Sequence, residues 1–210
     1  FPALPPMTFD IRRGEIAFLR DENYNTGRRL HECFLGDRGW TSGFFRLNGR
    51  LYQPGDLGRV IGSEIGIQIE RPDRPGGVLF DNMTALDNLC TSLIPKAGQH
   101  IIRKKIVSSI LSEALRWFPK EMLLQPLSSW SYPERLRFSY YRWYLLNPRL
   151  LICFFPFAGQ ESTHHKMIID LLVLCAQRGM AVWIISSGID AICEKTDNEE
   201  FLRRLHYLNK

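Results

Sequence analysis

The residue types best suited to ligand chemistry in this sequence lie in one loop near its beginning. The apolar segment Ile16–Leu19 leads into Arg20–Leu30, which contains Gly27 followed by the cations Arg28 and Arg29. In a phosphate-binding loop of the form GxxxxGK[ST], glycines let backbone N–H groups surround phosphate oxygens, while the lysine and the hydroxyl serve phosphate and magnesium. This loop keeps a glycine and a cation but lacks the hydroxyl. Gly27, Arg28 and Arg29 therefore form an incomplete candidate phosphate site.

Two acidic residues in the same loop oppose this chemistry. Asp21 and Glu22 place negative charge where a phosphate would lie. In a partly buried site, that repulsion costs on the order of a few kcal/mol. The sequence therefore favours an ordinary strand-to-helix turn over a phosphate site.

The centre of the predicted fold is an apolar run, Leu150–Phe155, between Pro148 and Pro156. A run of this length with turn residues at both ends predicts a strand buried on both faces. An amphipathic helix over 162–178 and a second apolar run, Met180–Ser186, follow it. Strand, helix and strand in this order predict two adjacent parallel strands with the helix packed on them, the core unit of an α/β fold.

The chain around this unit contains the segments LSSWSYPERLRFSYYRWYLLNPRLLICFFPFAG and GMAVWIISSGID. These segments resemble the second half of an ATP-binding cassette domain of the sugar-importer type, and in particular the second of its two tandem cassettes. Leu127-Ser128 match the start of the family's Leu-Ser-Gly-Gly signature, and Arg142-Trp143 match its arginine-tryptophan pair. The basic-Gly-Glu-Ile step at Arg13–Ile16 also resembles the family sequence that precedes its phosphate loop.

Several motif positions depart from the family pattern. The family strand ends in Asp-Glu, which the resemblance implies for magnesium and the catalytic base, but this sequence has Phe154 and Phe155 there. At the switch position, where the family carries His or Glu, this sequence has Gly188, which has no side chain to polarise a substrate. Because a strand sends successive side chains to opposite faces, we expect one phenylalanine under the adjacent helix and the other in the former nucleotide cleft, beside Tyr24 or Trp130.

The signature is altered as well. Ser128 is followed by Ser129 and Trp130 in place of the family's glycines, and we expect Trp130 to occupy the space that a phosphate needs. Pro133 suits the first turn of a helix, so the helix is predicted to survive without its anion site. The aromatic residues that follow are predicted to be core rather than a base-stacking platform. They are Phe138, Tyr140, Tyr141, Trp143 and Tyr144.

These departures predict a degenerate, non-hydrolysing cassette-like domain that acts as a protein-interaction or regulatory module. This hypothesis implies no catalytic residue, no cofactor and no metal site. The alternative is an ATP-binding subunit of a sugar transporter that retains weak ATP binding through Arg28 or Arg29, with or without ATP hydrolysis. A third possibility is a domain paired with a competent cassette that supplies the working phosphate loop. In each case we expect a protein partner, namely a permease, another cassette or a flanking regulatory domain.

The predicted architecture is a single domain over 1–210 with a P-loop NTPase-like core, a parallel sheet, an antiparallel β arm and a helical subdomain at about 84–143. Asn48-Gly49 predicts the hairpin of the arm. Helices are predicted over 82–93 and 101–118 from the helical spacing of their apolar residues.

Other segments have plainer interpretations. Phe9–Leu19 predicts two short strands around an Arg-Gly turn, and Gln68 is predicted to lie inside a strand rather than to sense magnesium. Asp73-Arg74 resemble the end of a sugar-type loop. His164-His165 are assigned to an exposed helix start, because no third metal ligand is near. The tail 197–204 is predicted to be a charged surface helix.

Composition limits the remaining function classes. The chain has 210 residues, is 45% hydrophobic and carries a net charge of +5, so it can bury one sizeable core and attracts anions only mildly. Lys104-Lys105 are more typical of a solvated helix face than of a nucleic-acid patch. Five cysteines without a CxxC pair, two of them (Cys153 and Cys175) at core positions, favour a reducing, cytoplasmic setting. No apolar run reaches the length of a membrane span. Since the sequence begins at Phe1, we expect it to be part of a longer chain.

Overall fold

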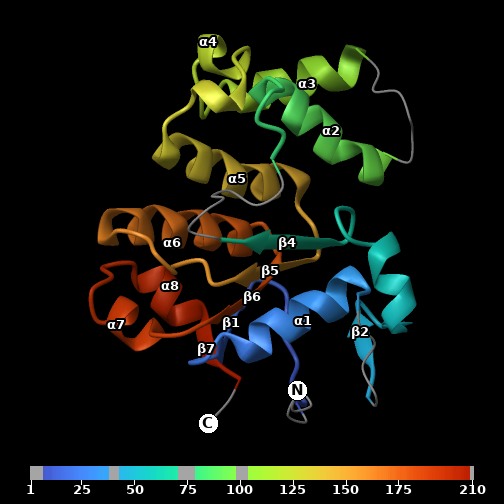
Figure 1. The fold of residues 1–210 in the computed structure, drawn as a ribbon, viewed down its shortest axis with the longest axis vertical. Coiled ribbons are helices and arrows are strands. Elements are labelled where there is room, and N and C mark those ends of the chain that lie inside the picture. The colour runs from blue at the N-terminus through green and yellow to red at the C-terminus, as the bar shows by residue number, and fades with distance from the viewer. Residues whose placement is uncertain (1–6, 38–42, 71–78, 98–103, 209–210) are drawn as a thin grey trace.

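A parallel sheet forms the centre of the protein, which we describe from a computed structural model. The structure describes residues 7–37, 43–70, 79–97 and 104–208. The sheet has five strands in the order β4 (Ile65–Ile69), β5 (Leu150–Phe154), β6 (Ala181–Ser186), β1 (Ile16–Arg20) and β7 (Leu205–Tyr207). All neighbouring pairs are parallel. Figure 1 shows this sheet in the lower part of the molecule, with α1 and α6 beside it.

The helices fall into two groups (Figure 1). Those near the sheet are α1 (Asn25–Leu35), α6 (Ser162–Gln177), α7 (Ile189–Cys193) and α8 (Glu199–Arg204). Those of the upper part are α2 (Ala85–Ala97), α3 (Lys104–Ala114) and α4 (Lys120–Leu123), with α5 (Tyr132–Leu146) between them and the sheet. Short 3₁₀ helices occur at Pro54–Arg59 and Leu127–Ser129.

The predicted strand-helix-strand unit is confirmed. β5 and β6 are adjacent and parallel, with Ile152 opposite Trp183, and α6 connects them. Every residue of both strands is buried. Burial on two faces explains why these strands read as continuous apolar runs rather than as alternating patterns.

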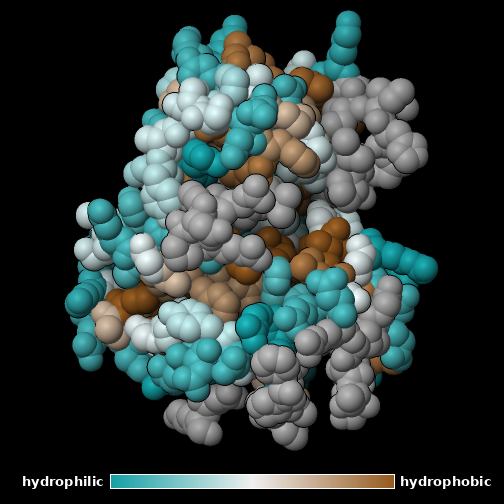
Figure 2. Space-filling model, in the orientation of Figure 1, coloured by the Kyte–Doolittle hydropathy of each residue, from teal (hydrophilic) through white to brown (hydrophobic). Residues whose placement is uncertain are grey.

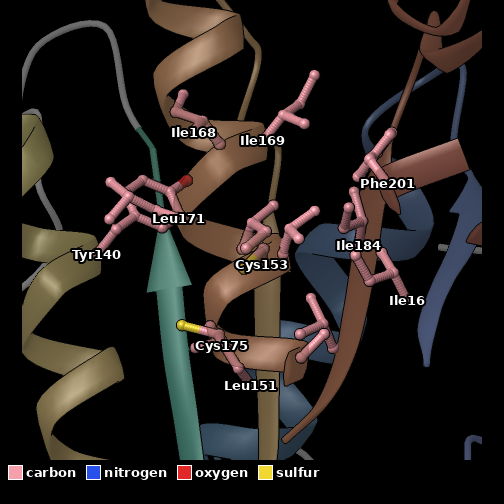
Figure 3. Close-up of a cluster of buried hydrophobic side chains, with 14 of the residues drawn as sticks. Ile16, Tyr140, Leu151, Cys153, Ile168, Ile169, Leu171, Cys175, Ile184 and Phe201 are labelled. Atoms are coloured by element: carbon pink, nitrogen blue, oxygen red, sulfur yellow. The ribbon is translucent and has the colours of Figure 1, made fainter. Parts of the chain in front are cut away.

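Side chains alternate between the two faces of the sheet and so build two cores. Ile16, Phe18, Leu151, Cys153, Val182 and Ile184 face α5 and α6. Ala17, Leu19, Leu150, Ile152, Phe154, Trp183 and Ile185 face α1. Figure 3 shows the first of these cores, in which Cys153 and Ile184 lie near α6 and Phe201 of α8 closes one side. Burial raises the pKa of Cys175 to about 12, so this core thiol stays protonated and unreactive.

The upper helices have their own hydrophobic cluster. It contains Ala85, Leu89, Ile110, Phe118, Leu123, Trp130, Phe138 and Tyr141, contributed by α2, α3, α4 and α5 and the segments between them. In Figure 2, hydrophobic residues also appear at the surface between the upper helices and the sheet. None of the described helices is long and apolar enough to cross a bilayer.

The predicted hairpin is confirmed. Strands β2 (Phe45–Leu47) and β3 (Arg50–Tyr52) pair antiparallel and form a separate two-stranded sheet. Asn48 and Gly49 both have positive φ, at 51° and 79°. This is the backbone that a two-residue hairpin turn requires, which explains the Asn-Gly sequence.

Several local predictions are wrong. Phe9–Ile11 form no strand, because their apolar side chains pack under the sheet next to Trp183 instead of pairing with a neighbour. Helix α2 begins at Ala85 rather than at 82, and α3 ends at Ala114 rather than at 118. Residues 101–103 and the pair Asp73-Arg74 lie outside the described part of the chain. Strand β7 is missing from the sequence-based prediction, since three residues carry too little pattern to be recognised.

The α6 face of the sheet offers a direct test of this packing. Leu172 is fully buried in the first core. We expect Leu172→Ala to lower the free energy of unfolding by about 2–5 kcal/mol, because it removes buried methyl groups and leaves a cavity in the core. Leu115→Ala, at a leucine that is 45% exposed, is the matched control and should change stability by less than about 0.5 kcal/mol. Chemical denaturation measures both, and equal losses would contradict this assignment of the core.

Candidate functional site

The candidate site lies where β1, β5 and β6 end. In open α/β sheets, ligands bind outside the carboxyl ends of the strands. Here β1 ends at Arg20 and turns through Asp21–Tyr24 into α1, while Phe155 follows β5 directly. The structure therefore confirms the predicted strand-to-helix turn and brings its residues next to the end of β5.

The Asp21 carboxylate occupies the start of α1. It accepts hydrogen bonds from the backbone N–H groups of Thr26 at 3.3 Å and of Gly27 at 2.8 Å. Asp21 is only 4% exposed, and its own N–H donates to the Ser186 carbonyl at 2.9 Å. Free N–H groups at a helix start are what a phosphate-binding loop offers to its ligand. In this protein, two of them are bound to a negative group of the chain itself.

Phe155 fills the space above this turn. A Cβ atom at position 27 would lie 2.4 Å from Phe155 Cζ, so the ring packs directly on Gly27. The Phe155 ring centroid also lies 4.8 Å from that of Tyr24. Both Tyr24 and Phe155 adopt positive φ, at 58° and 55°, a backbone that side-chain-bearing residues adopt rarely. The glycine of the incomplete phosphate loop thus serves to admit an aromatic ring.

The predicted alternation of the two phenylalanines to opposite faces is wrong, because the positive φ of Phe155 interrupts the strand geometry and both rings join the α1 side of the sheet, with centroids 6.4 Å apart. Phe154 is the more deeply buried of the two. Its side chain is fully buried in the core under α1, with its ring 5.2 Å from the His31 ring in an edge-to-face arrangement. One phenylalanine thus lies under a helix and the other at the turn, as expected, but both do so from the same face of the sheet. Phe155 lies beside Tyr24, and not beside Trp130.

The cations of the candidate site do not converge with Gly27. Gly27, Arg28 and Arg29 are consecutive residues of α1, so their directions differ by about 100° per residue. Gly27 is buried, Arg28 is exposed and Arg29 is partly exposed. Only Gly27 faces the closed turn.

The segment Ser128–Trp130 differs from its sequence-based prediction. Ser128 and Ser129 lie in a 3₁₀ turn, and Trp130 is 6% exposed, with its ring 5.4 Å from those of Phe118 and Phe138. The prediction that Trp130 occupies phosphate space is wrong, because its large apolar ring gains more by entering the core of the upper helices. The predicted burial of the aromatic set on α5 is confirmed for Phe138, Tyr140, Tyr141 and Trp143, and Tyr144 is partly buried.

The start of α5 has its own acidic cap. Ser131 precedes the helix and Pro133 lies in its first turn, as predicted. The Glu134 carboxylate accepts a hydrogen bond from the Ser131 N–H at 2.8 Å. This capping box satisfies the helix start within the chain.

A pocket of about 320 Å³ remains beside Tyr24, between the turn after β5 and the end of β6. Gly188 lines it and directly precedes α7 with a φ of 67°, and His165 and Lys195 also belong to the lining. Burial lowers the pKa of His165, opposed by hydrogen bonds with the backbone of Phe157 and Gln160, so the ring is neutral at pH 7. The described residues lining the pocket include no carboxylate, so they provide neither a magnesium ligand nor an acidic general base.

Gln68 has a structural role inside β4. Its side-chain nitrogen donates to Glu70 at 2.7 Å and to Ser139 at 3.2 Å, and its oxygen accepts from Trp143 Nε1 at 2.8 Å. Gln68 is fully buried, which agrees with its predicted place inside the strand. Sequence reasoning did not identify Glu70, a carboxylate that is only 3% exposed. Its position next to residues 71–78 gave no pattern that separates it from a surface acid.

ATP and magnesium, which the family resemblance implies, do not fit the described residues. The Asp21 carboxylate already binds the loop N–H groups, and the Phe155 ring packs on the loop glycine. Within the described ranges, no three His, Cys, Asp or Glu side chains gather closely enough to hold a metal ion. His164 and His165 lie in the first turn of α6, as predicted, but both are partly buried rather than exposed.

Known proteins resemble this chain in sequence. No protein-family profile matches it. A ribose/galactose/methyl galactoside import ATP-binding protein of Pseudomonas syringae pv. tomato is 25% identical over 194 residues, which cover 91% of this chain and 37% of that protein. The galactofuranose transporter ATP-binding protein YtfR of Escherichia coli K12 is 23% identical over 202 residues, covering 96% and 39%. The chain thus spans less than half the length of these relatives.

Solved structures resemble it in fold. The structure of cbiO1 from Clostridium perfringens, part of the ABC transporter complex cbiONQ, matches with a TM-score of 0.72 at 20% identity, covering 99% of this chain and 78% of that one. The ATP-binding cassette MJ0796, in a dimeric post-hydrolysis state bound to ADP and phosphate, matches with a TM-score of 0.68 at 18% identity, covering 98% and 86%.

The contact between Gly27 and Phe155 predicts an unusual sign for a mutation. In a helix, Gly→Ala ordinarily stabilises by about 0.5–1 kcal/mol. We expect Gly27→Ala to destabilise the protein by about 1–3 kcal/mol instead, because the new methyl group would meet the Phe155 ring.

The matched control introduces the same change in a Phe155→Ala background. There the contact with the ring is gone and only Ile185 Cγ2, at 3.1 Å, must give way, so Gly27→Ala should lose most or all of its destabilising effect. Urea unfolding of the four proteins measures the coupling. Additive effects of the two substitutions would show that the ring does not pack on this turn.

Proposed function

Since this chain has the fold of an ATP-binding cassette and resembles the ATP-binding proteins of sugar importers, we propose that it serves as a cassette domain of a transport assembly without hydrolysing ATP itself. The observation that carries this proposal is the closed turn after β1. There the Asp21 carboxylate takes the place of an anion, and the Phe155 ring covers Gly27. A nucleotide phosphate would have to displace both.

The energetic cost of reopening the site supports the proposal. An incoming phosphate would meet the buried charge of Asp21, and like charges in a partly buried site repel by on the order of a few kcal/mol. The two acids that a cassette would use are replaced by Phe154 and Phe155, and the loss of a general base alone costs about 10²- to 10⁴-fold in rate. Binding and chemistry are thus impaired separately.

The relatives favour a transport assembly over a free-standing regulatory module. The two named above are ATP-binding proteins of sugar import or transport. We propose a permease and a second, competent cassette as partners, with the second cassette supplying a working phosphate loop. All five cysteines are free, which supports a reducing, cytoplasmic setting. The separate cluster of the upper helices supports a helical subdomain at about 84–143 within a single domain over 1–210.

A regulatory or protein-interaction module remains the second candidate. The closed turn favours it, because a domain without nucleotide-driven motion presents a fixed surface to its partner. Purification of the full-length protein distinguishes the two candidates. A complex with a permease and a hydrolysing cassette supports the transport role, and a stable complex with a non-transport protein alone supports the module.

Calorimetric titration with ATP and magnesium tests the proposed closure of the site. We expect no heat of binding at micromolar protein and no hydrolysis, because the turn holds Asp21 rather than an open set of N–H groups. Micromolar affinity that Arg28→Ala removes would contradict the proposal. It would support the alternative subunit, which binds ATP through Arg28 or Arg29.

Restoring the acids of the family pattern gives a second test. We expect Phe154→Asp combined with Phe155→Glu to lower the free energy of unfolding by on the order of several kcal/mol, because Phe154 is fully buried in an apolar core. The double variant should also fail to hydrolyse ATP. Denaturant unfolding and an ATPase assay are run in parallel, with Phe154→Leu and Phe155→Leu as the apolar control. Unchanged stability, or turnover of ATP, would show that the site is open.

A further inference from the structure

An arginine-rich cleft lies near the amino ends of β1 and β7, whereas the closed turn at Asp21–Tyr24 lies at the carboxyl end of β1. It has a volume of about 560 Å³ and lies between the turn before β1 and the junction of α8 with β7. Its charged lining includes Arg12, Arg13, Arg203 and Arg204. Figure 1 shows α8, β7 and β1 close together in this part of the molecule. The cleft borders the residues that begin β1 and β7, whereas Phe155 follows the carboxyl end of β5.

Two of the arginines are fixed by contacts that join distant parts of the chain. Arg204 donates to the Gly14 carbonyl at 2.6 Å and pairs with Glu200, and it is only partly exposed. Arg13 donates through Nε to the Gly179 carbonyl at 3.2 Å. A guanidinium has five N–H donors, so the single hydrogen bond recorded for the Arg13 guanidinium leaves capacity for a ligand. These two residues form a preorganised part of the wall.

The other two arginines are more available. Arg12 is exposed. Within the described ranges, its guanidinium makes no ion pair and no hydrogen bond. Arg203 pairs with Glu200 but its side chain remains 73% exposed. They are therefore the residues of choice for testing the cleft.

The charge of the cleft favours an anion. Against the four arginines stand the carboxylates of Asp10 and Glu15 in the lining, together with Glu200, which pairs with Arg203 and Arg204. Positive charge is in excess even when all three acids are counted. One oxygen of Glu15 also accepts the backbone N–H of Arg12 at 2.7 Å, so this carboxylate serves the turn.

We propose that this cleft binds a small phosphate-bearing molecule. Arginine forks match phosphate oxygens in pairs, which gives both charge attraction and geometric specificity. The volume exceeds that of a single phosphate and lies in the range of small-molecule sites. This inference does not depend on the proposed function, because it uses none of the residues of the closed turn.

Titration calorimetry with inorganic pyrophosphate, in the absence of divalent metal, tests the proposal. We expect saturable binding to one site, weakened at least tenfold by Arg12→Gln combined with Arg203→Gln. The matched control removes two exposed arginines elsewhere, Arg59→Gln with Arg116→Gln, whose side chains are 83% and 74% exposed. It should leave the affinity unchanged within about twofold.

Further arms exclude the other sources of binding. Arg12→Gln alone breaks no recorded side-chain contact, so it keeps the test valid if the double variant fails to fold, and it should still weaken binding at least threefold. Arg28→Ala should have no effect. Absence of saturable binding, equal weakening in the Arg59 and Arg116 control, or loss of binding in Arg28→Ala would each overturn the proposal. A protein that binds single-stranded DNA but not pyrophosphate would overturn it as well.

Discussion

The hydrogen bonds from the start of α1 to the Asp21 carboxylate determine how the turn after β1 is stabilised. A helix start leaves several N–H groups without partners, and something must satisfy them. In a phosphate-binding loop, the ligand does so, but here Asp21 does it from inside the chain, at 2.8 Å from the Gly27 nitrogen. A negative side chain at this end also interacts favourably with the helix dipole. Two N–H groups of the loop are thus satisfied within the chain, without a ligand.

The two phenylalanines after and at the end of β5 complete the same change. Phe154 joins the core under α1, and Phe155 lies over Gly27 beside Tyr24. Aromatic rings at the end of a central strand gain from burial, by about 1.5–3 kcal/mol for a fully buried ring, whereas carboxylates there would need water, a metal or a cation. The strand itself is unaffected, because its remaining residues are apolar and face the same two cores. The fold and the chemistry of this site are therefore separable.

The start of α5 and the buried amide of Gln68 are satisfied in the same internal way. Glu134 caps α5, and Gln68 links β4 to Ser139 and Trp143 of that helix. Such contacts hold the upper helices against the sheet. Positive charge is instead available at the opposite end of the strands, where Arg12 precedes β1 and Arg203 lies in the last turn of α8. Two ends of one sheet thus differ in what they offer to a ligand.

The sequence by itself determined the parallel β5-α6-β6 unit, the hairpin at Asn48-Gly49 and the absence of acids at the end of β5. These features depend on local pattern, namely long apolar runs, turn residues with positive φ and the identity of single positions. It also identified Asp21 as a negative charge that opposes phosphate binding. Only the tertiary structure decided that this carboxylate binds the helix start and that Trp130 turns into the core of the upper helices. The same holds for β7, whose three residues become a strand only because β1 offers them an edge. Each of these outcomes depends on partners distant in space or on backbone direction, and the spacing of residues along the chain does not carry that information.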